Sequence, residues 1–140
     1  MKNLLGIAVA VIAGITALWL HDRRNRRQAE KRLATRPQLS PVQFGRTYFG
    51  ERETRAKLAA ELREILSHHV PYALDGLHPK DLFIEHLRMD ELDSMSTVEV
   101  VLEIEKRYGI DIPDSEVGTL HTFGALVDYL DRRLNSSARA

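Results

Sequence analysis

Apolar and polar positions divide the chain into two parts with different patterns. From Leu4 to Leu20 the chain has an uninterrupted apolar run, LLGIAVAVIAGITALWL, whereas beyond residue 50 apolar residues recur every three or four positions among charged ones. A helix of the first run spans roughly 25 Å at 1.5 Å per residue, which is enough to cross a bilayer. The second pattern is typical of amphipathic helices that share a core. We therefore predict a transmembrane anchor over 1–21, followed by an all-α domain.

Three segments of this domain have a helical period and recognisable ends. The segment 52–69 gathers its aliphatic residues on one stripe and stops before Pro71. A second helix is expected over 94–108, because Gly109 is placed to end it. Its residues at core spacing are Val100, Val101, Ile104 and Tyr108. A third helix should follow Thr122, a favoured N-cap residue.

The connections between these helices differ in length. The segment 71–90 contains two prolines and a glycine, which predicts a long loop with one turn at 81–86. The residues expected to pack beneath that turn are Phe83, Ile84 and Leu87. A short helical turn is expected at 115–120. We predict a bundle of three main helices and one short helix over 51–135, with a disordered tail at 136–140.

Charge is unevenly distributed, although the net charge is zero, with 20 basic and 20 acidic residues. The segment 81–128 is strongly acidic, whereas a basic cluster directly follows the apolar run. The basic residues are Arg23, Arg24, Arg26, Arg27, Lys31, Arg32 and Arg36. By the positive-inside rule this cluster places the domain in the cytoplasm, at the inner (cytoplasmic) membrane, and it can contact anionic lipid. Because the cluster lacks interleaved aromatic residues and a recognition motif, we expect no nucleic-acid partner.

The amino-terminal run has a competing interpretation as a cleaved secretory signal, led by Lys2. The residues around Ala17 are too bulky for a good cleavage site, so we favour an uncleaved anchor, and cleavage remains the alternative. After it, 22–50 is expected to be a basic juxtamembrane segment and a spacer. The spacer, 36–50, holds two prolines and two glycines and shows no helical period.

Few side chains offer catalytic or metal chemistry. The chain has no cysteine, and its six histidines lack ligand spacing, so we expect no metal. Ser94 stands at the start of the second helix, where a serine is a good N-cap. A nucleophilic role needs a base and an oxyanion hole, but Ser94 has neither a G-x-S-x-G motif nor a nearby histidine in sequence. We therefore predict that the protein is not an enzyme.

A third interpretation of Ser94 comes from the motif DSMSTVEVVLEIEKRYGIDIPDSE, which starts at Asp93. This motif closely resembles the central helix of acyl carrier proteins, which begins with Asp-Ser-Leu and is followed by Ile-Pro-Asp. DLFIEHL, before it, resembles the family's preceding loop, and TLHTFGALVDYL resembles its final helix. The resemblance covers Arg52 to about Leu134, and several elements agree in order and spacing.

The resemblance implies that Ser94 carries a 4'-phosphopantetheine arm, attached by a phosphopantetheinyl transferase that uses coenzyme A. Acyl or aminoacyl groups would then be held as thioesters on the arm, with Asp93 and Met95 beside the attachment point. Met95 replaces the family's usual leucine. A second register, with Glu91 at the modified position, would describe a carrier fold without an attachment site. The Ser94 register aligns the helix and all that follows without a gap.

The same resemblance implies a docking surface for partner enzymes on the helix after Ser94. The matching residues are Val98, Glu99, Leu102 and Glu105. Exposed aliphatic residues framed by carboxylates suit weak, fast binding to basic patches on acyl-loading and acyl-using enzymes. Lys106 and Arg107 depart from the family's more acidic helix. The function alternative to a tethered carrier is an unmodified, membrane-anchored helical adaptor that binds a basic partner through this surface.

Overall fold

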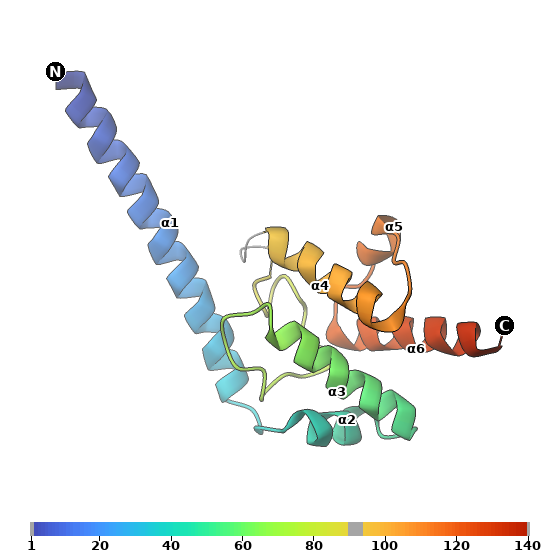
Figure 1. The fold of residues 1–140 in the computed structure, drawn as a ribbon. Helices are drawn as coiled ribbons and strands as arrows, with labels where there is room; N and C mark the ends of the chain where they lie inside the picture. Colours follow the sequence, from blue (N-terminus) through green and yellow to red (C-terminus); the bar gives the residue numbers. More distant parts are fainter. Residues whose placement is uncertain (1, 90–93, 140) are drawn as a thin grey trace.

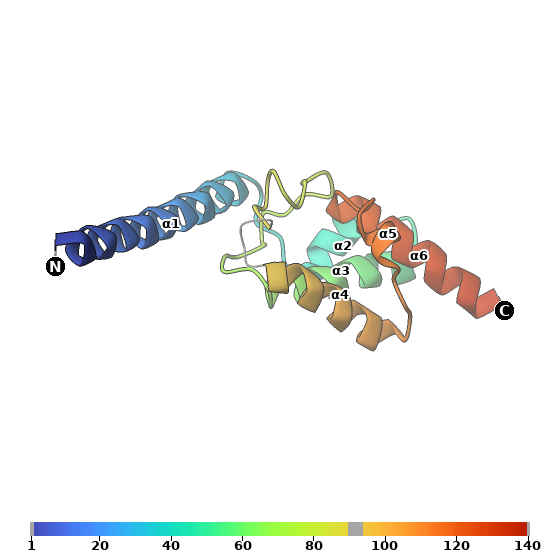
Figure 2. The same cartoon turned by 90° about the horizontal axis from the view of Figure 1, so that it is seen from above.

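The computed structural model describes residues 2–89 and 94–139, and within them the chain is all-helical (Figure 1). Its helices are α1 (Lys2–Ala34), α2 (Pro41–Phe49), α3 (Glu53–Ser67), α4 (Ser94–Tyr108), α5 (Asp114–Val117) and α6 (Phe123–Arg139). No strand forms in these residues, only an isolated antiparallel bridge between Leu82 and Thr122. The predicted all-α fold is therefore confirmed, and Figures 1 and 2 show α1 projecting away from the bundle.

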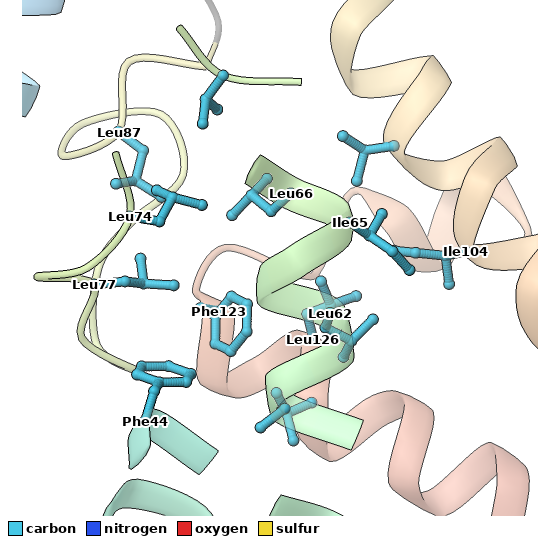
Figure 3. Packing of buried hydrophobic residues seen from close by; sticks show 14 of the residues in the cluster. Phe44, Leu62, Ile65, Leu66, Leu74, Leu77, Leu87, Ile104, Phe123 and Leu126 are labelled. Carbon is cyan, nitrogen blue, oxygen red and sulfur yellow. The ribbon is translucent and has the colours of Figure 1, made fainter. Parts of the chain in front are cut away.

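The core of the bundle is built around α3, which lies between α4 and α6 (Figure 3). Leu62, Ile65 and Leu66 on α3 are almost fully buried, and so are Ile104 of α4 and Phe123 of α6. The stripe predicted from the sequence therefore faces the core. Truncation of one such side chain to alanine typically costs about 2–5 kcal/mol, so this packing is a main source of stability.

The expected ends of the helices are found in the structure. Thr122 caps α6, because its Oγ1 accepts a hydrogen bond from the Ala125 N–H at 3.1 Å. Gly109 ends α4 with φ at +63°, a left-handed conformation that favours glycine. Asp114–Val117 forms the short α5 where a turn was expected at 115–120.

The prediction of an irregular spacer over 36–50 is wrong, because Pro41–Phe49 forms α2. Ser40 and Gln43 make a reciprocal capping box, and Pro41 occupies the first turn, where its missing N–H is not needed. Phe44 and Phe49 are buried, with ring centroids 5.3 and 6.3 Å from that of Phe123. The supposed spacer therefore contributes to the hydrophobic core.

The amino-terminal helix is longer than the apolar run that predicted it. α1 continues past Leu20 for fourteen more residues, as one helix, to Ala34. It is long and apolar enough to cross a membrane, and none of its apolar window is buried against the bundle. Its last part behaves differently, because Asn25, Ala29 and Leu33 are buried. Residues 22–34, expected to lie outside the domain, thus supply part of the core.

Two smaller expectations are also wrong. Residues 136–139 belong to α6, although a disordered tail was expected there. Ile84 does not pack beneath the loop turn, because it is 54% exposed, whereas Leu87 is fully buried and Phe83 is partly buried against the core. The turn itself is present, with the His86 N–H bonded to the Leu82 carbonyl at 3.0 Å.

Candidate functional site

The amino end of α4 is the candidate attachment site. Ser94 is the first residue of this fifteen-residue helix. Asp93 and Glu91 lie outside the described residues, and only the backbone is described at Ser94 and Met95. The cap interpretation of the Ser94 hydroxyl therefore stays a prediction, as does its role as an attachment point. Its place in the helix is shown, and it is the place at which backbone N–H groups are free to face an anion.

An apolar cavity of about 470 Å³ lies beside α4. Helices α3, α4 and α6 contribute Leu62, Leu66, Thr97, Val100, Val101, Ile104 and Leu126 to its wall. The loops contribute Leu82, Phe83, Ile84, Glu85, Met89, Ile112, Val117, Gly118, Leu120 and His121. Its size falls within the range of small-molecule sites, about 300–1,000 Å³. A predominantly apolar wall of this size suits a flexible hydrocarbon chain.

Sequence reasoning found one wall of this cavity and missed the other. Val100, Val101 and Ile104, which their helical spacing placed at core positions, line it. Tyr108 points elsewhere, because its hydroxyl donates a 2.8 Å hydrogen bond to Glu61 on α3, and burial raises the pKa of this phenol. The loop wall has no sequence period. Only a clustering of apolar residues between 82 and 89 could have signalled it.

The predicted docking residues on α4 divide into two kinds. Val98 and Leu102 lie one helical turn apart and are 55% and 56% exposed, although both are large aliphatic residues. Glu99 is exposed beside them. Glu105 instead serves the fold, because its Oε1 accepts the Ile112 N–H at 2.7 Å. The exposed pair and Glu99 thus form the docking face, a term used below for these three residues.

Two histidines directly after α3 bind carboxylates on α4. His69 Nε2 lies 2.5 Å from Glu103 Oε2, and His68 Nδ1 lies 3.2 Å from Glu103 Oε1. His69 Nδ1 also lies 3.6 Å from Glu99 Oε2. The hydrogen bond with His69, helped by that with His68, lowers the pKa of Glu103. These contacts connect α3 to the helix that carries the candidate site.

A buried carboxylate organises the loop that walls the cavity. Asp81 is 1% exposed, and its Oδ2 accepts the His78 N–H at 2.9 Å. Arg36, which follows α1, binds it in bidentate fashion, with Nη1 to Oδ2 at 2.5 Å and Nη2 to Oδ1 at 2.8 Å. These hydrogen bonds raise the pKa of Arg36. Arg32 Nε and His86 Nδ1 lie further away, at 3.8 and 3.7 Å from Oδ1.

Comparison with known proteins supports the resemblance seen in the motifs. The family model described as the phosphopantetheine attachment site matches residues 85–130. An acyl carrier protein of Acidothermus cellulolyticus is 34% identical over 77 residues, 55% of this chain and 88% of that protein. One from Rhodococcus erythropolis is 29% identical over 89 residues, 62% of this chain and 92% of that protein. The meromycolate extension acyl carrier protein of Mycolicibacterium smegmatis is 32% identical over 81 residues, 56% of this chain and 77% of that protein.

Proposed function

The chain belongs to the acyl carrier protein family, and we propose that it is a membrane-tethered carrier that holds acyl groups on an arm attached to Ser94. As a family member it is a carrier and not an enzyme, and its cofactor is a covalently attached 4'-phosphopantetheine. The transferase that attaches this group and the enzymes that load and use the acyl groups are its partners. The arm also explains how a chain without cysteine holds thioesters, because the thiol belongs to the cofactor.

The observation that carries the proposal is the position of Ser94 at the amino end of α4, beside the apolar cavity. A phosphate on this residue would lie near the positive end of the helix macrodipole and the free N–H groups of the first turn. Thr97, three residues further along α4, already belongs to the cavity wall. An acyl chain on the arm could therefore fold back into the cavity and be shielded from water.

The cargo that fits this cavity best is an aliphatic acyl chain. Burying a methylene group contributes about 0.8 kcal/mol, so an apolar wall favours hydrocarbon over a charged aminoacyl group. The name of the mycobacterial relative, a meromycolate extension carrier, agrees with acyl cargo. Partner enzymes would approach the docking face of Val98, Glu99 and Leu102, where a basic patch would meet exposed aliphatic side chains and a carboxylate.

The tether is the apolar part of α1. A helix with a fully exposed apolar window needs an apolar surrounding, and the bundle does not supply one. Arg23 stacks on Trp19, with its guanidinium 4.6 Å from the ring centroid, as expected where an apolar span ends at a membrane interface. With the arginines after Leu20 on the cytoplasmic side, the carrier domain lies in the cytoplasm at the inner membrane.

The test is the intact mass of the purified full chain before and after incubation with coenzyme A and a broad-specificity phosphopantetheinyl transferase. We expect the wild type to gain the mass of one phosphopantetheinyl group and Ser94→Ala to gain none. Ser96→Ala, two residues further along α4, is the matched control and should be modified like the wild type.

Two results would contradict the proposal in different ways. A folded wild-type chain that gains no mass with several transferases would favour the unmodified adaptor. Modification that persists in Ser94→Ala would move the attachment point to another residue and leave the carrier function standing.

A further inference from the structure

The carrier domain is packed directly against the tether. Asn25, Ala29 and Leu33 follow one another at four-residue intervals on α1, so they form one stripe, and all three are buried. Gly76 marks a close approach of the loop to the same helix, because a Cβ at this position would lie 1.8 Å from the Leu33 carbonyl oxygen. The end of α1 is therefore packed against the domain, so that the tether and the domain are not joined by a flexible linker.

Polar contacts join the end of α1 to the loop at two places. The bidentate pair between Arg36 and Asp81, called the clasp below, joins the end of the tether to the cavity loop. Closer to the apolar run, Arg88 Nη2 lies 3.2 Å from Gln28 Oε1 and 3.5 Å from Asn25 Oδ1. Arg88 has φ at +55°, a left-handed conformation that a non-glycine residue holds only when its surroundings impose it.

The number of helical residues between Leu20 and these contacts sets the distance of the contacts from the membrane. Leu20 ends the uncharged run, and Asn25 and Gln28 follow it by about 8 and 12 Å at 1.5 Å per residue. The headgroup layer on each side of a bilayer is about 5–8 Å thick, and a tilt of about 20° shortens the heights by less than a tenth. The guanidinium of Arg88, which contacts both residues, therefore lies at or just beyond the outer edge of the headgroup layer.

The same side of the domain carries the candidate attachment site. Met89 follows Arg88, and α4 begins five residues after Met89. In Figures 1 and 2 the amino end of α4 lies on the side of the bundle that faces α1, whereas α6 ends on the opposite side. Ile84 and Glu85, both exposed and both part of the cavity wall, are also in this loop. We call the loop 82–89 and the amino end of α4 the membrane pole.

We propose that the buried stripe on α1 and the clasp hold the carrier domain in one orientation. In this orientation the membrane pole lies against the headgroup layer of the membrane that α1 crosses. This inference rests on the proposed function, because it takes α1 as a membrane tether. The arm and the cavity mouth then operate in the layer next to the lipid. A carrier held in this way serves acyl-handling enzymes embedded in the same membrane, whose active sites open at headgroup level.

The absence of native cysteine permits a direct test with single labelled cysteines in the full chain. Ile84→Cys places a fluorophore on the membrane pole, and Thr54→Cys, also at an exposed residue, places it in the first turn of α3, far from α1 in Figure 1. Both proteins are reconstituted in phosphatidylcholine vesicles that contain a lipid with a quencher on its headgroup. Because the headgroup layer is only about 5–8 Å thick, the label at 84 should lose more than about half of its fluorescence and that at 54 less than about a tenth.

The clasp is tested in the same assay by Arg36→Ala. In the Ile84→Cys background this change should reduce the quenching, whereas Arg132→Ala, an exposed arginine on α6, should leave it unchanged. Equal quenching at the two label positions, or stronger quenching at 54, would overturn the orientation. Unchanged quenching in Arg36→Ala would overturn the role of the clasp.

Vesicle flotation and modification separate this inference from the proposed function. If the chain does not float with the vesicles, the tether fails and the orientation fails with it. If the chain floats and is phosphopantetheinylated but both labels are quenched equally, the proposed function stands and only the orientation is overturned.

Discussion

Replacing Arg36 with alanine should lower the free energy of unfolding by about 2–3 kcal/mol, because it leaves the Asp81 carboxylate buried without its main partner. Asp81 has 2% of its side chain exposed, and both of its oxygens bind the Arg36 guanidinium. Of its other partners, the His78 N–H is at hydrogen-bond distance, and Arg32 and His86 are more than 3.5 Å away.

The magnitude follows from how the pair is buried. Removing one partner of a fully buried pair costs about 3–5 kcal/mol. Arg36 has 26% of its side chain exposed, so in Arg36→Ala water enters the vacated space and solvates part of the carboxylate. The expected loss is therefore below that range. The double variant Arg36→Ala with Asp81→Asn should lose less than the sum of the single variants, with a coupling of about 1–3 kcal/mol.

The assay is urea unfolding of the full chain in detergent micelles, followed by circular dichroism at 222 nm. The apolar part of α1 is expected to stay helical in the micelle and to give a constant background. Arg132→Ala, on the exposed side of α6, is the control and should change stability by less than about 0.5 kcal/mol. A similarly small change in Arg36→Ala, or strictly additive effects in the double variant, would refute the reasoning.

Three further predictions concern the contact between α3 and α4, the packing of the loop against α1, and the docking face. Because its pKa is lowered in the folded state, Glu103 contributes stability that is present above its ordinary pKa of 4.5 and lost as the pH falls through the lowered value. Urea titrations should therefore show Glu103→Gln less stable than wild type at pH 7 and equal to it near pH 2, and an equal deficit at both pH values would contradict this. Gly76→Ala should destabilise the chain by about 1–3 kcal/mol, because its Cβ meets a backbone carbonyl of α1, whereas Gly118→Ala, with its nearest atom 3.7 Å away, should lower the melting temperature little or not at all. Leu102→Ser should leave stability within about 0.5 kcal/mol and slow acyl loading by a partner enzyme, unlike Val42→Ser, an equally exposed residue of α2, and equal loading rates would argue against the docking face.

The sequence predicted the helices whose apolar stripe repeats clearly. The apolar stripe of α3 includes Leu62 and Ile65, and its spacing is visible in the sequence. The helix ends at Gly109 and Thr122 also depend on local residue preferences that a single sequence displays. The candidate site was located differently, by the resemblance of the motif that starts at Asp93 to the central helix of acyl carrier proteins. Its position at the start of α4 required no tertiary information.

The sequence failed where tertiary contacts decide. The aromatic residues of α2 are too few to show a period, so Phe44 and Phe49 did not suggest a core helix, although Ser40 and Gln43 form a capping box that could have signalled it. On α1, the buried stripe through Ala29 lies among arginines. Because of these arginines, the segment was predicted to lie at a membrane interface, and the buried face of the helix was not predicted. The loop wall of the cavity depends on the Asp81 network, which only the folded chain brings together.

The central claim is that this chain is a carrier, modified on Ser94, that works at the membrane. The most direct measurement is the intact and peptide mass of the protein isolated from separated membrane and soluble fractions of its native host. We expect the protein to be recovered in the membrane fraction with one phosphopantetheinyl group on the peptide that contains Ser94, and part of it to carry an acyl group. Recovery of an unmodified chain, or of a modified chain in the soluble fraction alone, would contradict it.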